Sequence, residues 1–145
     1  MKISNVIGYF LATVLIILLI YFIQKQIQEY KLQDDPMLHT LKNVLKPLLE
    51  YYNIKNNLKL YKGDKSFTIN KEKIFLCLYD ENKEYYPINM LIYVILHEIA
   101  HYLNKEDIGH TEKFHAKFEE ILGKATELGI YNPCIPIIKN YCNAE

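Results

Sequence analysis

The residues of this sequence whose types and spacing most directly indicate chemistry are His97, Glu98 and His101, in the pentapeptide His-Glu-Ile-Ala-His. Two histidines four residues apart on a helix project from the same face, so one metal ion can bind both imidazoles. Glu98 points about a quarter-turn away, where its carboxylate can polarise a metal-bound water. Zn²⁺ by itself lowers the pKa of such a water to about 7. The pentapeptide therefore predicts two metal ligands and a general base.

The stretch before His97 predicts a buried helix that begins at Pro87. Nearly every residue from 88 to 96 is apolar, and proline is tolerated in the first turn of a helix. Two histidines and a glutamate on a buried helix are unfavourable unless their polar atoms are bonded. The alternative to a metal site is therefore a buried, hydrogen-bonded cluster of these side chains.

A third metal ligand is expected shortly after His101. Residues 102–108 lose the apolar periodicity and predict a polar loop, after which Gly109 permits a sharp turn. Thr111 predicts the N-cap of the next helix, and Glu112 is favourable in its first turn. His110 would then lie at a fixed helix entrance and point back towards the metal, which makes it the preferred third ligand.

Three other side chains compete with His110. His115 lies about 140° around the same helix, so the two cannot easily bind one ion, and we interpret His115 as a solvated residue. Glu119 and Glu120 remain alternatives, because some metallopeptidases use a helical glutamate as the third ligand.

Residues 74–122 resemble the small zinc metallopeptidases of the SprT and WLM (Wss1-like) group. In that group a strand precedes a helix that ends in H-E-x-x-H, and a histidine with a phenylalanine four residues later follows a short loop. The corresponding segments here are Ile74–Leu78, His97–His101, His110 and Phe114. The resemblance implies a zincin fold, Zn²⁺ on the three histidines and Glu98 as general base. It also implies a polypeptide substrate that pairs with an edge strand at residues 74–79.

The remaining pattern predicts a minimal α+β domain around the motif. Apolar residues at helical spacing up to Tyr52 predict an amphipathic helix that begins at Pro36 and is kinked or divided at Pro47. Residues 58–61, 66–70 and 73–80 predict a small, mostly antiparallel sheet packed on the His97 helix. A last helix from residue 112 should end at Gly129, and the apolar tail 131–138 should pack back on the domain. Candidates for stabilising an oxyanion are Tyr102, Tyr131 and Tyr141.

The N-terminal segment predicts a membrane anchor. Val6–Ile23 contains 18 residues without a charge, and with two polar residues before it the run spans about 30 Å, the thickness of a bilayer core. The run is too long for a typical signal peptide and lacks a small-residue cleavage site. We therefore expect residues 1–24 to form an uncleaved anchor that contacts the membrane through residues 4–23. Residues 25–35 follow as a polar continuation or linker, and residues 36–145 form the zincin-like domain.

Composition narrows the partners and the compartment. The 17 basic residues, all lysines, balance 17 acidic ones, so nucleic acid is not favoured as a partner, and neither is the DNA–protein crosslink association of the resembled group. More lysines follow the span than precede it, which predicts a cytoplasmic domain. Cys77, Cys134 and Cys142 are odd in number and lack the spacing of a disulfide framework, which suits a reducing compartment. In an oxidising compartment Cys134 and Cys142 could still form a disulfide.

The sequence as a whole predicts a membrane-anchored zinc metallopeptidase and makes no prediction of oligomeric state. Glu98 would take a proton from the metal-bound water and pass it to the leaving amine. The alternative is a non-catalytic membrane-anchored module with a structural or vestigial metal site. A structural zinc site has four protein ligands, whereas a catalytic one leaves a position open.

Overall fold

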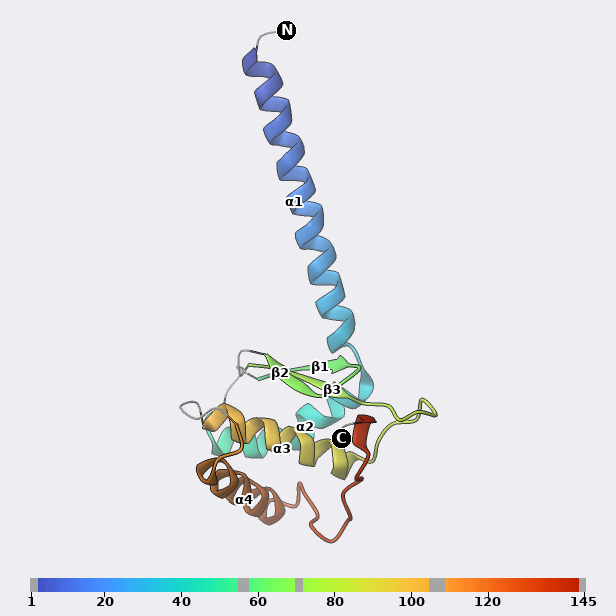
Figure 1. The fold of residues 1–145 in the computed structure, drawn as a ribbon, viewed down its shortest axis with the longest axis vertical. Helices are drawn as coiled ribbons and strands as arrows, with labels where there is room; N and C mark the ends of the chain where they lie inside the picture. The colour runs from blue at the N-terminus through green and yellow to red at the C-terminus, as the bar shows by residue number, and fades with distance from the viewer. Residues whose placement is uncertain (1–2, 55–57, 70–71, 105–108, 144–145) are drawn as a thin grey trace.

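A computed structural model describes residues 3–54, 58–69, 72–104 and 109–143, with only the backbone of Ser4 and Asn143. Within these residues it contains α1 (Ile3–Gln33), α2 (Pro36–Tyr51), β1 (Lys59–Gly63), β2 (Phe67–Ile69), β3 (Lys73–Cys77), α3 (Ile88–Leu103), α4 (Glu112–Glu127) and a 3₁₀ turn (Tyr141–Asn143). Figure 1 shows α1 rising from one side of the sheet, with α2, α3 and α4 on the other. The predicted α+β class is confirmed. Most of the predicted polar loop, residues 105–108, lies outside the described residues.

The sheet differs from the expected, mostly antiparallel one. Its strand order is β1-β3-β2; β3 pairs in parallel with β1 over five residues and antiparallel with β2 over three. The chain reverses direction between β1 and β2 and again between β2 and β3, so β1 and β3 run in the same direction. β3 lies between the other two strands and therefore pairs with both. The expectation that residues 74–79 form a free edge is therefore wrong, because β3 is the central strand and β2 is an edge.

The hydrophobic core lies between the sheet and the helices opposite α1. Alternation along β3 directs Ile74 and Leu76 to this side, where both are fully buried, as is Leu78 beyond the strand. They share one apolar cluster with the buried residues of α2, α3 and α4. Burying each such side chain contributes about 1.5–3 kcal/mol, so this cluster holds α3 firmly against the sheet.

Helix α2 begins where its capping signals place it. The Asp35 carboxylate accepts a hydrogen bond from the Met37 N–H at 2.9 Å, and Pro36 occupies the first helical position. The helix continues as one element through Pro47 to Tyr51, so it is not divided there. Proline removes one helical hydrogen bond, and four fully buried leucines of α2 hold the helix in place despite that loss.

Asp35 is also a buried acceptor that ties α2 to the chain after β3. It is 5% exposed and accepts hydrogen bonds from the hydroxyls of Tyr79 at 2.8 Å and Tyr85 at 3.1 Å. We expect Asp35→Ala to lower the free energy of unfolding by about 2 kcal/mol, because it removes a cap and the carboxylate acceptor of two tyrosine hydroxyls, which keep only the bond between them. Denaturant unfolding of the detergent-solubilised chain measures this value.

The neighbouring Asp34 provides the matched control for this prediction. Its carboxylate is exposed and lies 3.6 Å from His39, also exposed. Asp34→Ala should change the free energy of unfolding by less than about 0.5 kcal/mol. Equal effects of the two substitutions would contradict the role given to Asp35.

Helix α1 is continuous from Ile3 to Gln33, so the predicted polar stretch after the apolar run is a helical continuation as far as residue 33. The helix is long and apolar enough to cross a membrane, and its apolar window is not buried against the domain. Its last turns reach the sheet, where Lys73 Nζ lies 2.8 Å from Glu29 Oε1. This ion pair and the packing of α1 on β1 connect the helix to the domain.

The cysteines do not follow the sequence expectation. Cys77 and Cys142, 65 residues apart, form a disulfide, and Cys134 is free and exposed. The C-terminal turn returns to the end of β3, where the Tyr141 hydroxyl donates a hydrogen bond to the Cys77 carbonyl at 2.7 Å. This return of the chain brings Cys142 next to Cys77. Disulfides persist in oxidising compartments, so the pair opposes the cytoplasmic side that the lysines predict. The tail packs back only in part, because Ile135 and Ile137 are both 43% exposed.

Candidate metal centre

The structure brings His97, His101 and His110 together. Their Nε2 atoms lie 3.2 Å apart between His97 and His101, 3.3 Å between His101 and His110, and 3.0 Å between His110 and His97. The first two project from one face of α3, as their spacing requires. They form the cluster of metal-ligating groups found among the described residues.

Local signals at the start of α4 place His110. Gly109 has φ +95°, a left-handed conformation that residues with a Cβ rarely adopt, and it turns the chain back towards α3. The Thr111 hydroxyl accepts a hydrogen bond from the Phe114 N–H at 3.3 Å and caps the helix, as predicted. His110 is fixed between the glycine turn and this cap.

The geometry and donor chemistry of the three histidines fit a zinc ion. Three ligands of a tetrahedral site with Zn–N bonds of about 2.0–2.1 Å lie about 3.3–3.4 Å apart, close to the distances found here. A neutral imidazole has one N–H and one lone pair. Each Nε2 atom is therefore either a donor or an acceptor, so among three mutually adjacent Nε2 atoms at least two are of the same kind and cannot hydrogen-bond to each other. A cation that accepts all three lone pairs removes this mismatch, and zinc is such a cation.

The surroundings of His97 favour its neutral, metal-binding form. Burial, and then the neighbouring His101 and His110, lower the pKa of His97 to about 4, so it offers a lone pair at neutral pH. Aromatic rings hold the imidazoles in position. The Phe114 ring stacks on His101 at 4.3 Å between centroids, and Phe118 lies 5.3 Å from His97.

Glu98 lies one residue beyond the first histidine and is bonded to the sheet. The Thr68 hydroxyl on β2 donates a hydrogen bond to its Oε2. Burial raises the pKa of Glu98, while the Thr68 bond and the nearby His110 lower it. Sequence reasoning missed Thr68. The sequence does contain a signal for it: Thr68 is the polar residue between Phe67 and Ile69. Strand alternation directs its side chain to the face of the sheet opposite these two apolar side chains.

The competing ligands lie outside the cluster. His115 is exposed, and its ring centroid is 6.3 Å from that of His110. Glu119 is also exposed, and Glu120 accepts a hydrogen bond at 3.2 Å from the hydroxyl of Tyr52, the residue that follows α2. The structure therefore brings His110 to the other two histidines and keeps these three side chains apart from them.

The three tyrosines considered for an oxyanion have different surroundings. The Tyr141 hydroxyl is bonded to the Cys77 carbonyl and lies 2.8 Å from the Ser66 hydroxyl. Burial raises the pKa of Tyr141 to about 12. Burial also raises the pKa of Tyr131, whose ring lies 6.0 Å from Tyr93. Tyr102 is buried on α3. We assign Tyr141 a structural role, because its hydroxyl joins the C-terminal turn to β3.

The fold is similar to that of a solved protein. The crystal structure of Wss1 from Saccharomyces cerevisiae superposes with a TM-score of 0.55 and 21% identity, over 64% of this chain and 77% of that one. The chain therefore has a Wss1-like fold, which supports a fold relationship with the WLM group. No family model matches the sequence.

Two viral proteins are similar in sequence. The chain is 50% identical over 98 residues to the uncharacterized protein 136R of Invertebrate iridescent virus 6, covering 66% of this chain and 54% of that protein. It is 45% identical over 100 residues to the uncharacterized protein 042R of Invertebrate iridescent virus 3, covering 68% of this chain and 62% of that protein. The chain thus spans little more than half the length of these relatives.

Proposed function

We propose that the chain is a membrane-anchored, zinc-dependent metallopeptidase. The observation that carries the proposal is the triangle of Nε2 atoms from His97, His101 and His110, with sides of 3.0–3.3 Å. A half-buried glutamate, Glu98, follows the first histidine on the same helix, and the Wss1-like fold supports the same function. The substrate class is polypeptide.

Each side chain of the site has a distinct role in this proposal. His97, His101 and His110 would hold Zn²⁺, which supplies Lewis acidity when bound. Thr68 holds Oε2 of Glu98, which leaves Oε1 to accept a proton from the attacking water. The same carboxyl then passes this proton to the nitrogen of the leaving amine. Phe114 and Phe118 keep the histidine rings oriented and exclude water from one side of the site.

The count of ligands favours an enzyme over a structural metal site. A structural zinc has four protein ligands, whereas the cluster among the described residues has three histidines. A non-catalytic module remains the second candidate. Retention of zinc together with the absence of any Glu98-dependent hydrolysis would favour it.

For the N-terminal helix we propose a single membrane span through residues 4–23. The support is its length, its apolar composition and the exposure of its apolar side chains. The excess of lysines after the span favours the cytoplasmic side for the domain, whereas the Cys77–Cys142 pair favours an oxidising side. The redox state of this pair in cells therefore reports the orientation.

Metal content tests the site directly. The purified full chain should carry about one zinc per molecule, and His110→Ala should lose it because two histidines remain. His115→Ala is the matched control, since His115 lies five residues further and is exposed; it should keep the zinc. Mass spectrometry of the metal together with circular dichroism measures binding and folding. A folded wild-type chain that takes up no zinc would overturn the proposal.

A further inference from the structure

One face of the sheet has apolar side chains that the domain does not cover. Strand alternation directs one set of residues away from α3, and we call this set the outer face: Tyr61, Phe67, Ile69, Lys73 and Phe75. The Phe75 ring stacks between those of Tyr61, at 5.0 Å, and Phe67, at 4.8 Å. The outer face thus carries a continuous stack of three rings on the side opposite the core; its Tyr61 end, on β1 where α1 packs, is only 1% exposed.

The edge-strand part of the outer face is open. Phe67 is 43% exposed and Ile69 is 42% exposed, although exposed apolar residues on an edge strand favour aggregation in a free soluble protein. Beside them, a cavity of about 510 Å³ lies between Leu32 at the end of α1 and the sheet. Phe67 and Phe75 line it, together with residues 62–65. An apolar surface beside lysines matches the chemistry of a lipid headgroup region.

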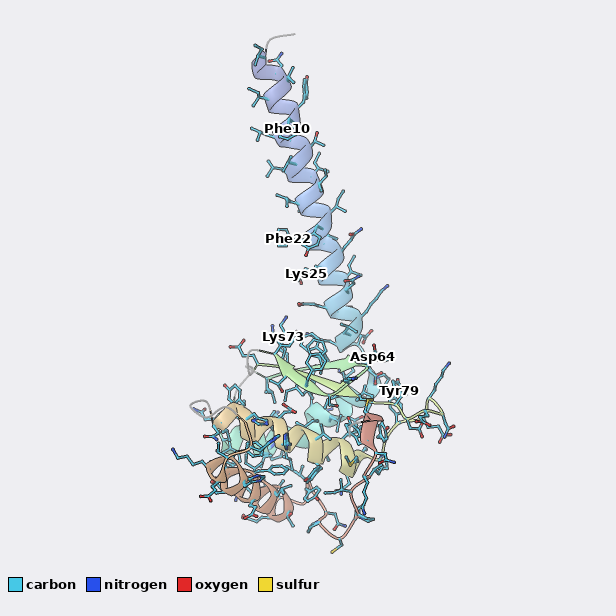
Figure 2. All side chains as sticks on the ribbon, in the orientation of Figure 1. Phe10, Phe22, Lys25, Asp64, Lys73 and Tyr79 are labelled. Carbon is cyan, nitrogen blue, oxygen red and sulfur yellow. A yellow bond between two sulfur atoms is a disulfide. The ribbon has the colours of Figure 1, made fainter. Side chains whose placement is uncertain are left out.

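Helix α1 sets the height of the outer face above the bilayer. It leaves the domain from this side of the sheet, and Figure 2 shows Lys73 near its foot, with Phe22 and Phe10 progressively further away. Glu29, the partner of Lys73, lies six residues beyond Ile23, which is about 9 Å along a helix axis. The headgroup layer extends about 5–8 Å beyond the hydrocarbon core. If residues 4–23 span the bilayer, the outer face lies at its surface.

The charge of this side fits an anionic bilayer. The whole chain has a net charge of zero. In the described residues from 25 to 33 and from 58 to 77, six lysines outnumber three acids. The lysines are Lys25, Lys31, Lys59, Lys62, Lys65 and Lys73, and the acids are Glu29, Asp64 and Glu72. Each lysine near an anionic surface contributes about 1 kcal/mol of attraction, so this end of the domain is drawn to the membrane.

We propose that the outer face is a membrane-contact surface that rests on the headgroups of an anionic bilayer, the same bilayer that α1 spans. The inference rests on the proposed anchoring and goes beyond it, because an anchored domain need not touch the lipid. Apolar side chains, phenylalanine among them, enter the boundary between headgroups and acyl chains, and Phe67 is the most exposed aromatic residue of the outer face. Thr68 points to the other side of the sheet, so Glu98 faces away from the lipid.

Tryptophan reporters test this contact, because the chain contains no tryptophan. We would compare three full-length variants in vesicles of phosphatidylcholine and phosphatidylserine. Phe67→Trp reports the outer face, Phe10→Trp reports the span, and Ile137→Trp, at a position with the same 43% exposure as Phe67, is the matched control on the C-terminal tail. Spin-labelled lipids quench tryptophan near the label. Headgroup-labelled lipid should quench Phe67→Trp several-fold more than Ile137→Trp, and chain-labelled lipid should quench Phe10→Trp.

The outcomes separate this inference from the anchoring. If Phe10→Trp is quenched and Phe67→Trp behaves like Ile137→Trp, the contact is overturned and the anchor stands. If Phe10→Trp is not quenched, both are overturned. Shielding of Phe67→Trp that grows with protein density and is insensitive to the lipid label would indicate a second copy or another protein, and would also overturn the contact. Ile69→Trp, on the same strand, repeats the measurement if Phe67→Trp does not fold.

Discussion

Glu98→Gln is expected to lower the rate of peptide hydrolysis by about 10²–10⁴-fold while zinc content stays unchanged, since a general base contributes an effect of this size. The amide cannot accept the proton of the attacking water, yet it keeps the size of the side chain. It can also still accept the bond from Thr68. The three histidines are unaltered, so metal binding should persist. Cleavage of an unfolded protein substrate by the zinc-loaded chain measures the rate.

The matched control for this prediction is Glu119→Gln, which makes the same chemical change at an exposed position of α4. Its activity should equal that of the wild type. Activity that survives in Glu98→Gln would exclude this glutamate as the base. Zinc loss in that variant would mean that Glu98 contributes to metal binding.

Cys77→Ser is expected to lower the free energy of unfolding by about 4 kcal/mol, because the disulfide closes a loop of 65 residues and restricts the unfolded chain. For a domain of this size the loss corresponds to a fall in melting temperature of roughly 15 °C. Thermal unfolding without reductant measures it, and reductant should destabilise the wild type by a similar amount. Cys134→Ser, which removes the free and exposed thiol, should leave the melting temperature unchanged.

A thiol titration gives the same prediction a second readout. Chain isolated from cells with thiols blocked should show one free thiol out of three after denaturation, namely that of Cys134. Three free thiols would place the domain in a reducing compartment, in agreement with the lysine distribution. Unchanged stability in Cys77→Ser would show that the disulfide contributes nothing to the fold.

The parts of the structure that the sequence predicted are those set by local chemistry. The spacing of His97 and His101, the glycine turn at Gly109 and the cap at Thr111 all act within a few residues. Together they were enough to bring His110 back to α3. The starts of α2, α3 and α4 and the end of α4 followed from the same kind of signal, namely proline, threonine and glycine beside helix ends.

The parts that the sequence did not predict depend on contacts between distant segments. Each strand is visible as a pattern, but which strand becomes central is decided by how β1, β2 and β3 pair. The bond between Thr68 and Glu98 joins residues 30 apart, and it exists only because β2 is the edge strand above α3. The Cys77–Cys142 pair likewise depends on the path of the C-terminal tail, which no short-range signal specifies.

The disulfide also gives the chain a covalent ring. The ring runs from Cys77 to Cys142 and contains all three histidines and Glu98, whereas α1, α2, β1 and β2 lie outside it. A single peptide-bond cut between residues 78 and 141 would open the ring without separating its ends, so the site-bearing segments would stay joined on a non-reducing gel. A cut at the corner between α1 and α2 would instead divide the chain into two pieces that the disulfide does not join, with α1 in one and the three histidines and Glu98 in the other.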